Sequence, residues 1–404
     1  MKILVAVIVL TALALAGSGR MRSANSGASV ARSLYGGSEL MVVGLLLGSD
    51  FVNLIDEATL DGLRPFIFVA LGWLAFLFGL QFERRALLVI PAGFVGISAT
   101  VAVVTLIVVT PVAVIGLGGL AGGPTSSLLL ASATLAASAA CSGQSAIAIL
   151  DRRHQPGPRH AMTLLRLVSS LDPVVGVTVF GIALSLLARR GVEPSGFPWS
   201  LQWLVAAICV GLLTAWLFVS MTVTRTNQSE LVLYILGVIA LTSGLALGFG
   251  LSVLFVNFLC GLAVANLTHQ GSIRGRVMNL MVGSEAFLYL LITLVAGACW
   301  HLPTGWAAAV VVAYVASRLV GKTVGVWFTT RLLARRHPVP PSLGLGLASQ
   351  GGMGLAIIIE YRFAIDDPLA STAVAVALAA VFVSELTAPW LVRRVARREL
   401  ETVS

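Results

Sequence analysis

The sequence predicts an all-α membrane protein of about 13 transmembrane helices, arranged as two inverted repeats with crossed, discontinuous helices. The 404-residue chain is 58% hydrophobic and only 11% charged, whereas soluble domains carry roughly a quarter charged residues. Apolar runs of about 18 residues or more recur along it, each long enough to cross a bilayer core. Two of these runs are interrupted at their centres by small and polar residues. Because lipid satisfies no backbone hydrogen bonds, long apolar runs indicate helices.

The apolar runs define the expected spans. We place them at about 2–17, 37–56, 65–82, 87–112, 126–150, 161–188, 200–222, 230–248, 250–268, 278–300, 305–330, 342–362 and 368–392. We therefore expect a single transmembrane domain over residues 1–404 without a soluble regulatory domain. Repeat 1 covers about 1–188, a linker helix about 200–222, and repeat 2 about 230–392.

Basic residues fall mostly on one side of these spans. With the N-terminus outside, 18 of the 26 Lys and Arg residues lie on the cytoplasmic side and five on the other. The positive-inside rule explains this bias and the net charge of +9, so no nucleic-acid partner is expected. We expect a multi-pass protein of the bacterial inner membrane with a cytoplasmic C-terminus. Residues 1–17 also resemble a signal peptide, but a cleaved signal would leave Arg20, Arg22 and Arg32 outside, which favours a retained helix.

The two interrupted spans occupy the same fifth position in each repeat. The first has its small and polar run at Ser138–Ser145, and the second at Ala348–Gly352. Corresponding Gly/Ser-interrupted segments in two halves are typical of a transporter's midplane site. We expect the two to cross at Gly143, Gln350, Gly351 and Gly352, with half-helix ends facing each other. The alternative is a pair of small-residue packing faces.

The stretch "LLRLVSSLDPVVGV" contains charges inside a predicted span. Charges at the bilayer centre are costly, so they are functional candidates. Asp172 follows the first interrupted span, and Pro173 removes a donor and frees the carbonyl of Ser169, one turn back. Such oxygens suit a proton or a hard monovalent cation, although a structural ion pair is the alternative. Arg166 lies about 120° around the helix and about 9 Å along it from Asp172, so the two should not pair.

Other intramembrane charges lie in the second half. Arg318 and Lys322 are spaced i, i+4 and share a helix face, where they can balance a carboxylate. Glu285 and Glu385 are candidate secondary acidic sites, and for Glu385 a structural role is slightly favoured over a functional one. The four cysteines lack metal-ligand spacing, and no phosphate-binding loop occurs. We expect no cofactor, no metal beyond a transported ion, and no enzyme activity.

Several ordered segments resemble the monovalent cation:proton antiporter superfamily, which has the Na⁺/H⁺ exchanger fold. "GGSELMVVGLLLGSD" is similar to the family's G-E-L-x-x-G-x-x-L-G-P segment, and "VNFLCGLAVAN" to its F-x-x-G-L-x-x-A-N segment. "LASQGGMGLAI" resembles P-Q-G-G-L-A-L-A, and "SELTAPWLVRR" resembles S-E-x-x-x-P-x-L-x-R. "LGWLAFLFGLQFE" is similar to the family's F-x-x-G-L-x-x segment. The similarity extends along nearly the whole chain.

The resemblance implies a homodimer with the fifth, sixth, twelfth and thirteenth spans in a mobile core. It matches Asp172 to the second acid of the family's Asn-Asp or Asp-Asp pair, and Arg318, or alternatively Lys322, to a basic residue of the eleventh helix. The pair's first member is Leu171 here, and Cys141–Gln144 replace the fifth-helix motif.

From these residues we expect a secondary transporter that exchanges Na⁺ or K⁺ for protons by elevator-type alternating access. With one carboxylate instead of two, we expect electroneutral exchange. Asp172 carries either ion in turn, and Ser142, Gln144 and Ser169 are candidate oxygen ligands. The alternatives are an organic-anion carrier on the same fold and a non-transporting membrane sensor or assembly module.

Overall fold

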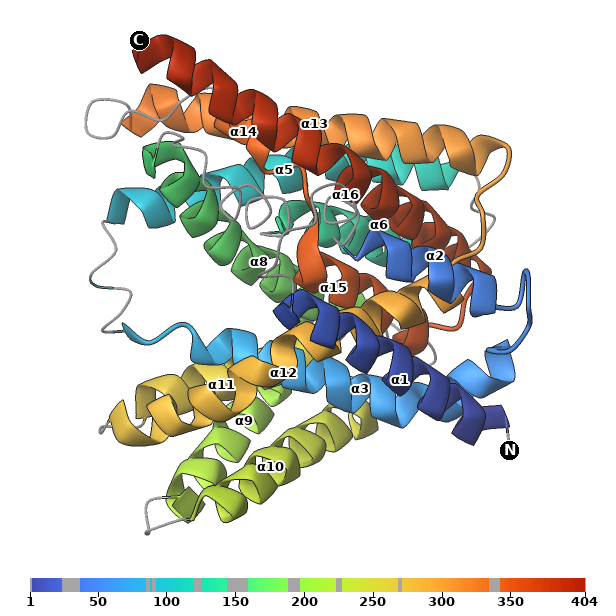
Figure 1. Cartoon of the computed structure of the whole chain (residues 1–404), viewed down its shortest axis with the longest axis vertical. Coiled ribbons are helices and arrows are strands. Elements are labelled where there is room, and N and C mark those ends of the chain that lie inside the picture. The colour runs from blue at the N-terminus through green and yellow to red at the C-terminus, as the bar shows by residue number, and fades with distance from the viewer. Residues whose placement is uncertain are drawn as a thin grey trace. The chain divides into compact units, whose positions relative to one another are not determined.

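The computed structural model describes residues 2–23, 37–84, 88, 92–119, 125–143, 159–187, 197–222, 227–267, 271–333 and 342–403. All regular secondary structure in these ranges is helical, which confirms the all-α fold class (Figure 1). The helices are α1 (Lys2–Ser23), α2 (Ser38–Leu47), α3 (Glu57–Leu80), α5 (Ala92–Gly118), α6 (Thr125–Ala140), α8 (Arg159–Leu187), α9 (Phe197–Thr222), α10 (Gln228–Gly248), α11 (Val253–Leu267), α12 (Gly271–Ala298), α13 (Trp306–Leu333), α14 (Leu343–Gly346), α15 (Gly351–Ala364) and α16 (Pro368–Val403).

Each predicted span overlaps a helix, but the helices differ in length. Within the described residues, seven are long and apolar enough to cross a membrane, and an eighth counts if α12, bent by 47°, is one span. The helices α1, α2, α6 and α11 also contain apolar segments, but these segments are only 10–17 residues long. The chain is therefore an integral multi-pass membrane protein, and the number thirteen stays a prediction.

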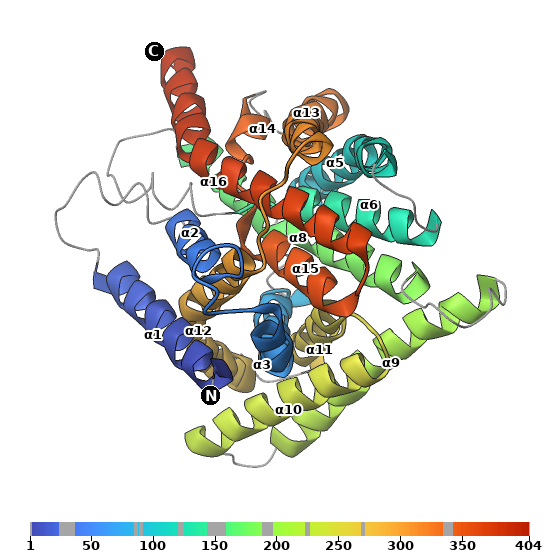
Figure 2. The same ribbon diagram turned by 90° about the vertical axis from the view of Figure 1, so that its right-hand side faces the viewer.

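The chain divides into two compact units. Unit 1 comprises Met1–Arg22, Leu54–Val89 and Phe180–Ile292, and unit 2 comprises Ser23–Asn53, Ile90–Val179 and Thr293–Ser404. In unit 1, α11 packs against both α3 and α9, and α9 lies beside α10 (Figure 2). The backbones of α3 and α11 meet closely, since a Cβ on Gly261 would lie 2.2 Å from the carbonyl oxygen of Phe76. Phe76 also makes an edge contact with Phe218 of α9, with ring centroids 6.3 Å apart.

Unit 2 contains both interrupted helices. The helix α13 packs along α5, where Gly321 and Gly325 meet the backbone of Thr105 and Val101. The helix α6 stops at Ala140, and residues 141–143 are not helical. In the second interrupted span, Leu347–Gln350 separate α14 from α15. Leu347 and Ala348 of the second break belong to an apolar cluster that includes Ile97 and Val168. The helix α8 runs unbroken through Pro173.

Candidate functional site

The two interrupted helices of unit 2 cross at glycine residues. The backbone N–H of Gly143 donates to the carbonyl of Ser349 over 2.9 Å. Gly351 adopts a left-handed φ of 70°, and a Cβ there would lie only 2.5 Å from the Cα of Gly143. Neither position has room for a side chain, so this crossing requires the small residues that interrupt the apolar pattern.

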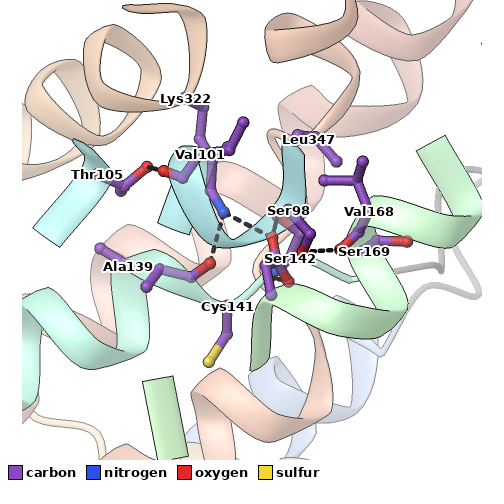
Figure 3. A network of polar contacts seen from close by, with 12 residues as sticks. Ser98, Val101, Thr105, Ala139, Cys141, Ser142, Val168, Ser169, Lys322 and Leu347 are labelled. Carbon is purple, nitrogen blue, oxygen red and sulfur yellow. Dashed lines mark hydrogen bonds and ion pairs between the residues drawn. The ribbon is translucent and has the colours of Figure 1, made fainter. Parts of the chain in front are cut away.

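Asp172 of α8 points at the end of the first interrupted helix. Its Oδ1 accepts the backbone N–H of Ser142 over 3.0 Å. Its Oδ2 accepts the Ser142 hydroxyl over 2.6 Å and the Lys322 ammonium over 2.8 Å. Figure 3 shows Lys322 extending from α13 toward Ser142. The side chains of Asp172 and Lys322 have no exposed surface, so this is a buried, hydrogen-bonded ion pair.

The two basic residues of α13 have different partners. Lys322 also donates to the carbonyl of Ala140, the last residue of α6, over 2.5 Å. Arg318, one turn earlier, donates to backbone carbonyls where α6 and α14 end. These carbonyls belong to Ala139, Cys141, Leu347, Ala348 and Ser349. The C-terminal ends of helices carry partial negative charge, so Arg318 stabilises the crossing while Lys322 compensates the carboxylate.

Glu385 of α16 lies at the other end of this crossing. Its Oε1 accepts the Ser349 hydroxyl over 2.7 Å and the backbone N–H groups of Gln350 and Gly351 over 3.0 and 3.2 Å. These N–H groups open α15, where the helix dipole is positive. A carboxylate at that position satisfies donors that have no partner inside the helix. Glu385 thus contacts the crossing directly.

Two further side chains extend the polar network from Gln350. The Gln350 amide nitrogen donates to Ser138 Oγ over 2.6 Å and to Tyr314 Oη over 3.1 Å. Sequence reasoning did not identify Tyr314, although its spacing places it on the same face of α13 as Arg318 and Lys322. It also overlooked Glu360 of α15, which is fully buried; a lone acid in "GLAIIIEYRF" gives the same signal as Asp172.

The remaining predicted residues lie elsewhere. Ser169 is buried, but its hydroxyl donates to the Arg166 carbonyl in its own helix over 3.1 Å and does not bond to Asp172. Arg166 itself is exposed on α8. Glu285 is exposed on α12 and belongs to unit 1, whereas Asp172 belongs to unit 2. Gln144 lies outside the described residues. The structure therefore brings together Asp172, Ser142, Lys322, Arg318, Gln350 and Glu385.

Comparison with known proteins gives one family. The family described as "Sodium/hydrogen exchanger, transmembrane" matches residues 38–394. No curated protein matches the chain by sequence. Among solved structures, the sodium proton antiporter MjNhaP1 from Methanocaldococcus jannaschii at pH 8 is 16% identical, with 97% of this chain and 98% of that chain covered at a TM-score of 0.70.

An electron-microscopy structure of MjNhaP1 is also similar. It is 15% identical, with 98% of each chain covered and a TM-score of 0.60. At these identities the likeness concerns the fold, and it agrees with the all-α transmembrane architecture.

Proposed function

The chain belongs to the transmembrane sodium/hydrogen exchanger family, and from this premise we propose that it is a secondary transporter that exchanges a monovalent cation, Na⁺ or K⁺, for protons. The single observation that carries the proposal is the buried pair of Asp172 and Lys322 at the helix crossing. Carboxylate and hydroxyl oxygens are hard ligands that suit such cations, and Asp172 and Ser142 supply both.

The charges of the pair support an electroneutral exchange. With Asp172 ionised and Lys322 protonated, the pair is neutral and holds one proton that can leave. When a cation binds the carboxylate and Lys322 releases that proton, the site is neutral again. A cation bound beside a protonated Lys322 would leave a net positive charge in the interior, which costs several kcal/mol. One cation for one proton keeps the buried charge constant.

We extend the proposal to the finer features of the family. The helices α6, α15, α16 and most of α8 fall into unit 2, which is consistent with a mobile core in elevator-type alternating access. We also propose a homodimer, with residues 1–404 forming one transporter domain of two repeats. The excess of arginines on one side of the spans favours a cytoplasmic C-terminus in a bacterial inner membrane.

Reconstituted vesicles that contain a pH-sensitive dye test the proposal. An inward Na⁺ or K⁺ gradient should move protons out of the vesicle lumen, whereas choline should not. Asp172→Asn should abolish this movement, and Asp61→Asn, which removes an exposed acid on α3, should leave it intact. Proton movement that is unaffected by Asp172→Asn would refute the assigned site.

The same vesicles distinguish the other functions. Signals driven only by organic anions would refute cation exchange, and silence under every gradient would refute transport. If exchange is electroneutral, an imposed membrane potential should leave the initial rate unchanged. A rate that follows the potential would refute the one-for-one stoichiometry.

A further inference from the structure

The orientation of the Gln350 amide is fixed by two hydroxyl groups. Ser138 Oγ donates to the carbonyl of Gly354 over 2.9 Å, and Tyr314 Oη donates to the carbonyl of Leu135 over 3.0 Å. Each hydroxyl has a single hydrogen, so each can only accept from Gln350. The side of the amide that faces them must therefore be the NH₂ group, and both of its hydrogens are used.

The other side of the amide is an oxygen that lacks a donor. Gln350 has no exposed surface, and its Oε1 has no hydrogen-bond partner among the described residues. A buried carbonyl left unsatisfied costs about 1–3 kcal/mol, and native structures rarely leave one so. The amide cannot turn to avoid this cost without losing its bonds to Ser138 and Tyr314. An oxygen held in this way is suited to a ligand that enters from outside the chain.

The backbone holds Gln350 at the crossing, next to Gly351. Glu385 accepts the N–H groups of Gln350 and Gly351. A Cβ on Gly351 would lie 3.0 Å from the nitrogen of Gly143 and 3.2 Å from the carbonyl oxygen of Ser142. Ser142 is the residue that binds Asp172 through both its N–H and its hydroxyl. The free oxygen thus belongs to the second interrupted span, and the ion pair contacts the first interrupted span through Ser142.

The charges at the crossing make a neutral oxygen useful. Arg318 and Lys322 provide two positive charges, and Asp172 and Glu385 provide two negative charges close to them. Another carboxylate would bind a cation but would add a charge that must itself be compensated in the interior. An amide oxygen offers a lone pair to a dehydrated cation without changing this balance, as backbone carbonyls do in selectivity filters.

We propose that Gln350 Oε1 is a ligand of the transported monovalent cation, which it meets at the crossing next to Asp172 and Ser142. This inference rests on the proposed function. Asp172 supplies the carboxylate that binds the cation in exchange for a proton. Gln350 supplies a neutral oxygen that replaces part of the ion's hydration shell. Gln350 therefore sets cation affinity and the preference between Na⁺ and K⁺, and not the proton stoichiometry.

The experiment compares Gln350→Met with Ser132→Ala in the full chain. Methionine retains the length of glutamine but lacks the oxygen. Ser132 is an equally buried polar residue of α6, eight residues before the end of that helix and thus about 12 Å along it from the crossing. Two readouts are used: the Na⁺ and K⁺ concentrations that give half-maximal exchange, and the rise in unfolding temperature in detergent when Na⁺ replaces choline.

We expect Gln350→Met to raise the half-maximal Na⁺ concentration about tenfold, equivalent to about 1.4 kcal/mol, and to reduce the Na⁺-dependent thermal shift. The pH dependence at saturating Na⁺ should stay as in the wild type, and Ser132→Ala should change neither readout. An unchanged half-maximal concentration in folded Gln350→Met overturns the inference, as does an equal change in Ser132→Ala.

Asp172→Asn separates this inference from the proposed function. If Asp172→Asn abolishes the Na⁺ response and Gln350→Met does not alter it, the proposed function stands and the role of Gln350 falls. A wild-type protein that responds to neither Na⁺ nor K⁺ overturns both. Should Gln350→Met fail to fold, Gln350→Glu, which retains an oxygen on this arm, must keep a Na⁺-dependent thermal shift; its absence in the folded variant overturns the inference.

Discussion

Lys322 Nζ lies 2.8 Å from Asp172 Oδ2, and neither side chain has any exposed surface. Each of the two charges is therefore tolerated in the interior only because the other is present. The same atoms must separate if a cation is to reach the carboxylate. Under the proposed function, the pair is thus both a stabilising element and the part of the site that competes with the ion.

Removal of Lys322 alone should destabilise the protein. Lys322→Met leaves Asp172 buried without its counter-charge, and breaking one partner of a buried pair costs about 3–5 kcal/mol. We expect a clearly lower unfolding temperature in detergent at neutral pH. Lys322→Met combined with Asp172→Asn should recover much of the lost stability but no exchange activity.

Lys322→Arg is the matched control, because it retains the charge. It should keep more stability than Lys322→Met, although the planar guanidinium does not reproduce the position of the ammonium. If Lys322→Met unfolds at the wild-type temperature at neutral pH, Lys322 is not what compensates Asp172.

The crossing should not accept a methyl group. Gly351→Ala places a Cβ only 2.5 Å from the Cα of Gly143, which is closer than two such atoms can approach. Gly351 also has a φ of 70°, a conformation that favours glycine. We expect a strong loss of folded protein, as seen by size-exclusion chromatography. Gly237→Ala in α10 is the control, since nothing lies within 4 Å of a Cβ there; it should be neutral or stabilise by up to ~1 kcal/mol. Equal behaviour of the two variants would contradict the close crossing.

The sequence identified residues that meet at this crossing better than it identified how they pair. Asp172, Lys322 and the glycine-rich breaks are identifiable because each departs from the surrounding apolar pattern. The partner of Asp172 was not identifiable, since Arg318 and Lys322 share a helix face and lie only one turn apart. A rise of about 6 Å along α13 decides which of them reaches α8, and that rise depends on how α13 packs against α5.

The roles of Glu385 and Gln350 depend on tertiary contacts. Glu385 lies near the end of an apolar span, where an acid is ordinarily solvated, and only the contact of α16 with the start of α15 brings it to the crossing. Gln350 was predicted at the break, but the orientation of its amide follows from hydroxyls on α6 and α13. The spacing of residues along one helix cannot predict contacts that join three helices.

Glu385 should cap the N-terminus of α15, and both its negative charge and its acceptor oxygen should contribute to stability. Glu385→Ala leaves the Ser349 hydroxyl and the N–H groups of Gln350 and Gly351 without this acceptor, and each buried unsatisfied group costs about 1–3 kcal/mol. Glu385→Gln retains an oxygen but loses the favourable charge at the helix N-terminus. We expect the unfolding temperature to fall in the order wild type, Glu385→Gln, Glu385→Ala. Wild-type stability of Glu385→Ala would contradict this role.

Asp56 should contribute to acid stability but not to the pH dependence of exchange. It caps α3 by accepting from Thr59, and its Oδ2 lies 2.9 Å from Lys2 Nζ. The hydrogen bonds from Thr59, together with Lys2, lower the pKa of Asp56 from 3.8 to about 2. Because the folded-state pKa is lowered, this contribution is fully present above pH 3.8 and is lost as the pH falls through about 2.

Asp56→Asn tests this assignment, since asparagine is also a good N-cap. Its unfolding temperature should be close to that of the wild type at pH 7 and should fall less between pH 4 and pH 2, where only the wild type loses an ionised cap. Its exchange rate should follow the wild-type pH profile between about pH 5 and 9, since Asp56 stays ionised throughout that interval. A shifted exchange profile would mean that Asp56, and not the buried pair at the crossing alone, contributes to proton sensing.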